Sequence, residues 1–219
     1  MKQPAFSWDR FWQMPVVGIL RNIPPESLQY ILPAYQAAGF TSIEITMNSP
    51  GASGMIREAC AQYGSSMNIG AGTVCEPDDL EAALDAGAGF IVTPVVVDTV
   101  IRTCAERKIP IFPGAYTPTE IYNASKLGAD LVKVFPASAS GPGFIKELKG
   151  PLPHIRLLPT GGVNLDNCID FLKAGAAGLG IGGQLFDKAL IAERNWKQLE
   201  EHLRQYADKI NGYRRMEKV

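Results

Sequence analysis

The feature that most constrains the fold is a repeated pairing of a helical stretch with a following apolar run. In four places the helical stretch ends at a glycine, in QAAGFTSIEI, LDAGAGFIVTP, KLGADLVKVFP and KAGAAGLGIGG. These glycines, Gly39, Gly87, Gly128 and Gly175, are spaced 48, 41 and 47 residues apart. Glycine often ends a helix because it adopts the left-handed conformation at little cost. The spacing therefore predicts a repeated structural unit.

Four further apolar runs lie between these units: PVVGIL (15–20), MNIGAG (67–72), IPIFPG (109–114) and IRLLPTGG (155–162). Interleaving the two sets predicts eight strands separated by amphipathic helical segments such as PESLQYILPAYQAA. Helices between sequential strands imply parallel pairing with right-handed crossovers. Eight units in 219 residues predict an α/β fold of the (β/α)8 TIM barrel type. A doubly wound open sheet is the alternative, and it is disfavoured because no G-x-G-x-x-G follows the first strand.

The predicted organisation is a single barrel domain over residues 1–219. The segment FSWDRFWQ predicts an extra N-terminal helix within residues 1–14 that covers the bottom of the barrel. The barrel is expected over 15–190, and a C-terminal helix and tail over 191–219. This length is ordinary for one domain.

Composition and charge exclude several classes of function. The 21 Lys and Arg nearly balance 22 Asp and Glu, so we expect no nucleic-acid partner. No apolar run is long enough to span a bilayer, and the start lacks a signal-peptide core, so we expect a cytoplasmic protein with no membrane partner. Four scattered cysteines and two histidines do not form a metal-site pattern, and we expect no metal and no cofactor.

Two ionisable residues occupy strands that are otherwise apolar. Lys133 lies in DLVKVFP, and Glu44 lies in SIEIT. Alternation along a strand places Val132 and Val134 on the helix-facing side, which points Lys133 into the barrel. The same argument points Glu44 inward. Because an isolated buried charge is costly, we expect both groups to be paired or to be used in chemistry.

A lysine in a dry site can lose its proton and attack a carbonyl to form a Schiff base. A nearby carboxylate can then move protons at the adjacent carbon. Lys133 and Glu44 are therefore sufficient for a metal-free aldolase. The alternatives are a structural ion pair inside the barrel, or a Lys133 side chain that extends to solvent.

Glycine-rich turns follow the last two strands. Thr160, Gly161 and Gly162 precede one helical segment, and Gly182 and Gly183 precede the next. Backbone N–H groups at such turns bind phosphate, and this corner of a barrel is a frequent phosphate site. The alternative is that these glycines only form tight turns.

Further polar and aromatic residues are predicted at the carboxyl ends of the strands, where the chemistry of this fold collects. Arg21 could hold a carboxylate or a phosphate, or lie on the surface. Thr73, in GAGTV, offers a hydroxyl and a backbone N–H to a carboxylate, or serves as a helix N-cap. Phe135 is expected to form a wall of the pocket, and Pro94 lies at the end of the fourth strand.

Taken in order, these motifs resemble a known family. VVGILR, GFTSIEIT, IGAGTV, IVTP, IPIFPGAYTPTE, LVKVFPAS, LLPTGGV and GIGG are similar to the 2-keto-3-deoxy-6-phosphogluconate (KDPG) and 4-hydroxy-2-oxoglutarate (KHG) aldolases. The resemblance covers roughly residues 15 to 190, and the ordered set of motifs is highly specific although each piece alone is not.

The resemblance implies a class I, metal-independent aldolase that is commonly a homotrimer. Its small-molecule substrate would be a 2-keto-3-deoxy-6-phospho sugar acid, cleaved reversibly to pyruvate and glyceraldehyde 3-phosphate. Lys133 would be the Schiff-base lysine and Glu44 the general acid and base. The remaining roles implied are carboxylate binding by Thr73, a basic contact from Arg21, pocket walls at Pro94 and Phe135, and a phosphate site at Gly161, Gly162, Gly182 and Gly183.

Two positions depart from the phosphogluconate-type pattern. Asn48, in MNSP, stands where many members have an arginine, and this resembles the phosphogalactonate-type (KDPGal) branch. Gln184 stands where phosphate-binding members often have serine. Three alternatives to the KDPG or KDPGal reaction therefore stay open: an aldolase of a non-phosphorylated 2-keto acid such as 4-hydroxy-2-oxoglutarate, a phosphate-ester synthase or isomerase, and a non-catalytic barrel that binds a phosphorylated metabolite.

Overall fold

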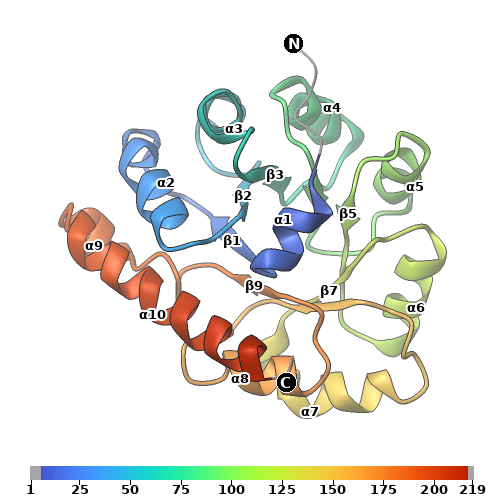
Figure 1. The fold of residues 1–219 in the computed structure, drawn as a ribbon. Helices are drawn as coiled ribbons and strands as arrows, with labels where there is room; N and C mark the ends of the chain where they lie inside the picture. The colour runs from blue at the N-terminus through green and yellow to red at the C-terminus, as the bar shows by residue number, and fades with distance from the viewer. Residues whose placement is uncertain (1–5, 217–219) are drawn as a thin grey trace.

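A computed structural model describes residues 6–216 and has an α/β fold in which parallel strands are surrounded by helices (Figure 1). The strands are β1 (Val16–Leu20), β2 (Ser42–Thr46), β3 (Asn68–Gly72), β4 (Ile91–Val92), β5 (Ile111–Phe112), β6 (Gly114–Ala115), β7 (Val132–Val134), β8 (Leu157–Pro159) and β9 (Leu179–Ile181). The helices are α1 (Trp8–Gln13), a 3-10 turn η1 (Pro25–Ser27), α2 (Leu28–Ala37), α3 (Ala52–Tyr63), α4 (Pro77–Asp85), α5 (Asp98–Glu106), α6 (Pro118–Lys126), α7 (Ala137–Lys149), α8 (Cys168–Lys173), α9 (Lys188–Ala192) and α10 (Trp196–Met216).

The strands form two parallel sheets. The larger sheet has the order β5-β4-β3-β2-β1-β9, and the smaller has the order β6-β7-β8. Each of the eight apolar runs contains a strand as expected, but the run 109–114 is divided into β5 and β6 at Pro113, which has no N–H to donate to a ladder. At the other junction of the two sheets, Thr160 forms an isolated parallel bridge with Gly180.

The strands separate two apolar clusters. Residues that face the helices, such as Ile43, Ile45, Val132 and Val134, belong to the large cluster between the strands and the surrounding helices. The smaller cluster is made of residues that face away from those helices, at Phe11, Val17, Phe90, Val92, Phe112, Leu131 and Leu158. The sequence neighbours of Glu44 and of Lys133 all belong to this large outer cluster. The strand alternation predicted for Glu44 and Lys133 is therefore present in the structure.

Helix α1 covers one end of the strands. Its Phe11 is fully buried in the smaller cluster, and the aromatic rings of Trp8 and Trp12 pack beside it. The polar contacts of α1 and its N-cap Ser7 lie at strand starts: the Arg10 carbonyl accepts from Thr41 Oγ1 at 2.7 Å just before β2, and Ser7 forms two hydrogen bonds with Asn68, the first residue of β3. Helix α1 therefore closes the amino end of the strands and leaves the carboxyl end for the site.

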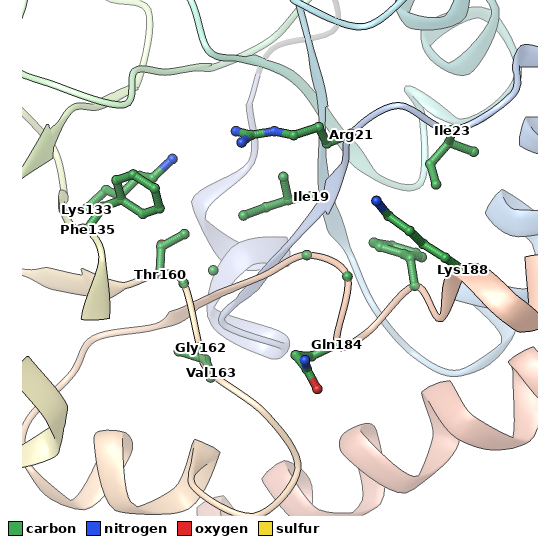
Figure 2. A pocket seen from close by; sticks show the side chains of 15 residues that line it. Ile19, Arg21, Ile23, Lys133, Phe135, Thr160, Gly162, Val163, Gln184 and Lys188 are labelled. Carbon is green, nitrogen blue, oxygen red and sulfur yellow. The ribbon is translucent and has the colours of Figure 1, made fainter. Parts of the chain in front are cut away.

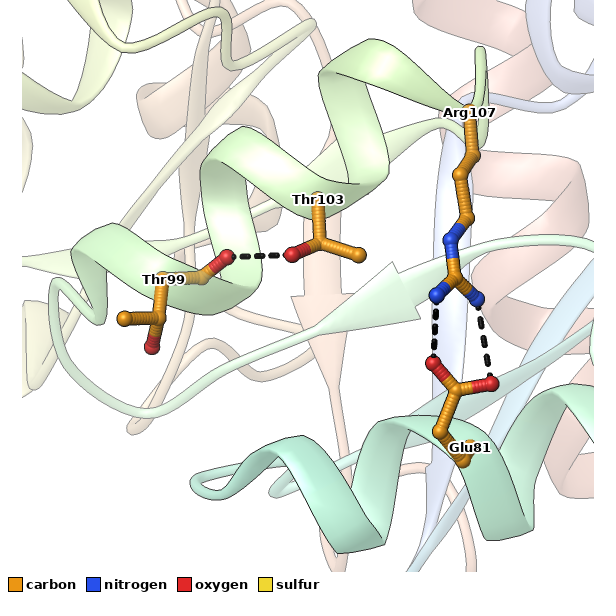
Figure 3. Close-up of polar contacts among 4 residues, drawn as sticks. All are labelled: Glu81, Thr99, Thr103 and Arg107. Carbon is orange, nitrogen blue, oxygen red and sulfur yellow. Dashed lines mark hydrogen bonds and ion pairs between the residues drawn. The ribbon is translucent and has the colours of Figure 1, made fainter.

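Neighbouring helices of the outer layer are also linked by polar contacts. Arg107, just after α5, forms a two-pronged ion pair with Glu81 of α4, with N···O distances of 2.7 and 3.0 Å (Figure 3). Within α5 the Thr103 hydroxyl donates to the Thr99 carbonyl at 2.8 Å. Both members of the ion pair are about half exposed, so solvent and salt screen the pair and its contribution to stability is small.

The long helix α10 packs against α2, α8 and α9. It contacts the turn after β9, where the Gln184 carbonyl lies 2.8 Å from His202 Nε2 and accepts from the Tyr206 hydroxyl at 3.0 Å. Residues 217–219 of the expected tail, and residues 1–5 of the expected N-terminal segment, lie outside the described part of the chain. Among the helices of residues 6–216, none is long and apolar enough to cross a membrane.

Candidate active site

A cavity of about 330 Å³ opens at the carboxyl end of the strands (Figure 2). Its walls come from the ends of β1, β7, β8 and β9 and from the start of α9. It brings together eight of the eleven predicted site residues, Arg21, Lys133, Phe135, Thr160, Gly161, Gly162, Gly182 and Gly183, and Gln184 also lines it. Segments that are more than a hundred residues apart in the chain thus converge on one concave surface.

Lys133 is the buried amine of this cavity. It is only 3% exposed, and its Nζ lies 5.1 Å from the centre of the Phe135 ring. Burial lowers the pKa of Lys133, and the nearby positive charge of Arg21 lowers it further, against the opposing effects of Glu44 and Cys75. The net direction favours the neutral amine, which is the form that attacks a carbonyl.

Glu44 is the buried carboxyl group of the site, and it lies on β2, on the side of the strand that faces away from the surrounding helices. It is 1% exposed, and within residues 6–216 neither of its carboxylate oxygens has a hydrogen-bond partner. Burial raises the pKa of Glu44, while Lys133 and Arg21 act in the opposite direction. A carboxyl group without partners in a native core calls for a functional explanation. A raised pKa favours the protonated acid, which can give a proton as well as take one.

The space around the Glu44 carboxylate depends on Gly72. A Cβ atom at position 72 would lie 2.5 Å from Glu44 Oε1 and 2.7 Å from Glu44 Cδ. Gly72 is paired with Thr46 at the end of the β2–β3 ladder, so its backbone cannot easily move away. A glycine is therefore needed at this position to leave room for the carboxyl group.

Arg21 and Thr73 meet at the ends of β1 and β3. Arg21 is exposed, and its Nη2 donates to Thr73 Oγ1 at 3.2 Å. Thr73 has a φ of +57°, in the left-handed region that a β-branched residue rarely adopts. Helix α4 has Glu76 as its N-cap residue, so Thr73 does not cap that helix. Strain of this kind, about 1–3 kcal/mol, concentrates at functional sites.

The two glycine-rich turns differ in why they contain glycine. Gly161 and Gly162 have φ values of +87° and +77°, and a Cβ at Gly162 would lie 2.5 Å from the Cβ of Ser138. In the described part of the chain, a Cβ at Gly183 would have no neighbour within 4 Å, and one at Gly182 would have only ordinary contacts. The first turn thus needs glycine for its geometry, whereas the second leaves open space beside the cavity.

Three of the singled-out residues do not line this cavity. Glu44 is not a lining residue, but its charge acts on the pKa of Lys133. Thr73 reaches it only through its hydrogen bond with Arg21. Pro94 lies against Gly114 of β6, whose added Cβ would be 2.2 Å from the Pro94 carbonyl oxygen.

Sequence reasoning missed several residues of the cavity. Ile19, Ile23, Val163, Gly180, Phe186 and Lys188 also line it. Strand alternation could have found Ile19, which lies two residues before Arg21 on the same face. Lys188 follows an irregular turn after β9, where no periodic pattern fixes the direction of a side chain.

A family model described as KDPG and KHG aldolase matches residues 9–202, most of the chain. The chain belongs to this family. The predicted family and the predicted enzyme class, a lyase of the class I aldolase type, are thereby confirmed.

Curated relatives and a solved structure agree with this assignment. This aldolase is 36% identical to the 2-dehydro-3-deoxy-6-phosphogalactonate aldolase of Escherichia coli (strain K12), over 91% of this chain and 98% of that protein. It is also 36% identical to the 2-dehydro-3-deoxy-phosphogluconate aldolase of Pseudomonas aeruginosa, over 92% and 90% of the two chains. The KDPG aldolase of Legionella pneumophila, solved with pyruvate captured as a covalent carbinolamine intermediate, superposes with a TM-score of 0.82 at 26% identity, over 89% and 95% of the two chains.

Proposed function

We propose that this aldolase reversibly cleaves a 2-keto-3-deoxy-6-phospho sugar acid of the gluconate or galactonate series to pyruvate and glyceraldehyde 3-phosphate. The observation that carries the proposal is the buried Lys133 amine at the cavity, with its lowered pKa. Relatives of both series match this chain at 36% identity. Asn48 in the MNSP segment favours the galactonate series.

In the proposed mechanism, Lys133 Nζ is the nucleophile. Its lone pair attacks the C2 carbonyl carbon to give a carbinolamine, and loss of water gives a protonated imine. When the C4 hydroxyl loses its proton, the C3–C4 bond breaks, the aldehyde leaves, and the bonding electron pair moves to the imine nitrogen. The resulting enamine takes a proton at C3, and hydrolysis of the imine then releases pyruvate and the free amine.

Glu44 moves the protons of these steps. As a carboxylic acid it protonates the leaving hydroxyl of the carbinolamine, and as a carboxylate it accepts the C4 hydroxyl proton. Its two partnerless oxygens and its raised pKa support this role. Phe135, beside Lys133, would exclude water from the imine.

The remaining residues would hold the two ends of the substrate. Arg21 and Thr73, which are hydrogen-bonded to each other, would bind the C1 carboxylate. The turns after β8 and β9 would hold the phosphate through backbone N–H groups at Gly161, Gly162, Gly182 and Gly183. Thr160 would line the phosphate end without donating its N–H, which is bonded to the Val134 carbonyl at 2.9 Å. Pro94 would act only as a wall behind the C1 end, because it lies outside the cavity lining.

We further propose that the two sheets form one closed (β/α)8 barrel and that residues 1–219 are a single domain. The short break at Pro113 and the Thr160–Gly180 bridge support this closure. A homotrimer is proposed from the family resemblance, and light scattering coupled to size exclusion tests it. A cytoplasmic location is proposed from the metabolic class of the substrates and from the four free cysteines.

A coupled assay of pyruvate release tests the proposed function. The purified chain is supplied with the phosphogluconate-type and phosphogalactonate-type acids, the unphosphorylated acid and 4-hydroxy-2-oxoglutarate. Rapid pyruvate release from a phosphorylated acid is the expected result. Release only from 4-hydroxy-2-oxoglutarate would contradict the phosphorylated substrate, and no release from any of them would contradict the proposed function.

A further inference from the structure

Lys188 is a third cationic group of the cavity, and nothing in the proposed mechanism uses it. It is the first residue of α9, and its side chain points into the cavity from the side opposite Lys133 (Figure 2). Ile19 lies between the two lysines in this view. Lys188 therefore stands at the end of the cavity away from the reacting amine.

The charge of the cavity is one-sided. Among its fifteen lining residues, three are cationic, Arg21, Lys133 and Lys188, and none is Asp or Glu. Burial lowers the pKa of Lys133 and so disfavours its charged form. Arg21 and Lys188 thus remain as the standing positive charges, one near Thr73 and one near the glycine-rich turn after β9.

The acidic residue nearest in the chain does not neutralise Lys188. Asp187 caps α9, and its Oδ1 accepts from the N–H groups of Ala189 at 2.8 Å and Leu190 at 3.1 Å. The ion pairs formed within residues 6–216 are Arg107–Glu81 and Arg204–Glu200, so Lys188 is in neither. Other lysines of the surface are also unpaired, but Lys188 differs from them because it faces an enclosed concave surface without acidic groups.

We propose that Lys188 binds the anionic group at the end of the substrate that becomes the aldehyde, and that it selects substrates carrying such a group. This inference rests on the proposed function. A sugar acid phosphate has an anion at each end, and the cavity offers Arg21 at one end and Lys188 at the other. The phosphate of a 6-phospho acid and the distal carboxylate of 4-hydroxy-2-oxoglutarate share this chemistry, and the flexible lysine could reach either one.

The residue at position 184 supports Lys188 as the group that binds the distal anion. The exposed Gln184 lines the same end of the cavity, and an amide supplies no positive charge. Its carbonyl is held by His202 and Tyr206 of α10, which fixes the backbone between the open turn at Gly182 and the start of α9. Lys188 is then placed on a fixed element, as a specificity-determining residue requires.

The test compares Lys188→Met and Lys188→Arg with the wild type and with Lys197→Met, an exposed lysine that does not line the cavity. KM and kcat are measured for the phosphorylated acid, the unphosphorylated acid and 4-hydroxy-2-oxoglutarate. We expect Lys188→Met to raise KM for the phosphorylated acid about tenfold, as for loss of a charge-assisted hydrogen bond, with kcat nearly unchanged. KM for the unphosphorylated acid should stay within about twofold, and Lys188→Arg should restore most of the affinity.

The outcomes separate this inference from the proposed function. A rise in KM for 4-hydroxy-2-oxoglutarate alone would assign Lys188 to a distal carboxylate and support anion binding. If the wild type cleaves its substrate, two results would overturn the role of Lys188. One is an equal rise in KM for the unphosphorylated acid, and the other is no rise in KM for any substrate. Failure of the wild type to release pyruvate would instead overturn the proposed function.

Discussion

Glu44 and Lys133 face the same interior from β2 and β7, and each shifts the ionisation of the other without forming an ion pair within the described chain. Burial outweighs their mutual attraction, so the pKa of Glu44 is raised and that of Lys133 is lowered. Both groups are therefore driven toward their neutral forms. A neutral amine beside a protonated acid is the pairing needed to begin imine formation.

Lys133→Met is expected to abolish turnover and to leave the fold intact. The two side chains have similar length, and the change removes the buried nucleophile, while Lys188, the other lysine of the cavity, lies on its opposite side. Steady-state pyruvate release should fall to background, while thermal unfolding stays close to that of the wild type. Lys146→Met, on the exposed surface of α7, is the control and should be fully active. Turnover like that of the wild type in Lys133→Met would end the proposed mechanism.

Glu44→Gln is expected to slow turnover by about 10²–10⁴-fold, the usual contribution of a positioned acid or base. Glutamine preserves the shape of the side chain but cannot accept or release the proton. The measurement is kcat at saturating substrate, with circular dichroism to check the fold. A loss smaller than about tenfold would assign Glu44 to a structural role instead.

Gly72→Ala tests whether the space for the carboxyl group matters. The new Cβ would meet Glu44 Oε1 at 2.5 Å, so the carboxyl group must shift or the strands must separate. We expect a loss of stability of about 1–3 kcal/mol, as for overpacking, together with reduced kcat. Gly212→Ala is a control in α10, where an added Cβ has no neighbour within 4 Å among residues 6–216.

The control should gain about 0.5–1 kcal/mol, because alanine favours a helix more than glycine does. Urea unfolding of both variants gives the comparison. Equal stability and activity of Gly72→Ala and the wild type would show that the carboxyl group does not need this space.

The burial of Lys133 predicts how stability depends on pH. In the unfolded chain its amine titrates near the ordinary pKa of 10.5, whereas in the folded chain the pKa is lower. Between these two values the unfolded state binds more protons, so this group makes the folded state more stable as pH rises. The free energy of unfolding of the wild type, relative to Lys133→Met, should therefore increase from the lowered pKa up to 10.5. If the difference in free energy of unfolding between the wild type and Lys133→Met stayed constant over this pH range, Lys133 would not be desolvated in the folded state.

Chelation is expected to leave activity unchanged. In the proposed mechanism the protonated imine accepts the electron pair of the breaking C3–C4 bond, so no bound metal is needed to stabilise it. Pyruvate release is measured before and after dialysis against EDTA, and again after adding Mg²⁺ or Zn²⁺. Loss of activity with EDTA and its recovery with a metal would point to a different class of aldolase.

Much of this architecture could be predicted from the sequence because strand alternation is a strong signal. The valines around Lys133 and the isoleucines around Glu44 are enough to predict the inward direction of both side chains, and these four apolar residues do pack in the outer cluster. The glycine-ended helices likewise predict where the following strands begin. The interruption at Pro113 also has a local cause, since proline cannot donate to a ladder.

The remainder of the site depends on loops, where no periodicity operates. Thr73 turns into the left-handed region, and its hydroxyl contacts Arg21 rather than the cavity. Pro94 packs against Gly114, a contact set by how two neighbouring strands approach each other. Lys188 enters the cavity because of the path of the turn after β9, which depends on its contacts with α10.

Borohydride trapping with pyruvate tests the central claim most directly. The wild type and Lys133→Met are incubated with pyruvate and reduced, and the products are analysed by intact mass and peptide mapping. The account predicts one pyruvate-derived adduct on Lys133 in the wild type and no adduct in the variant. A folded wild-type protein without an adduct, or an adduct on another lysine, would contradict the assignment of Lys133 as the Schiff-base residue.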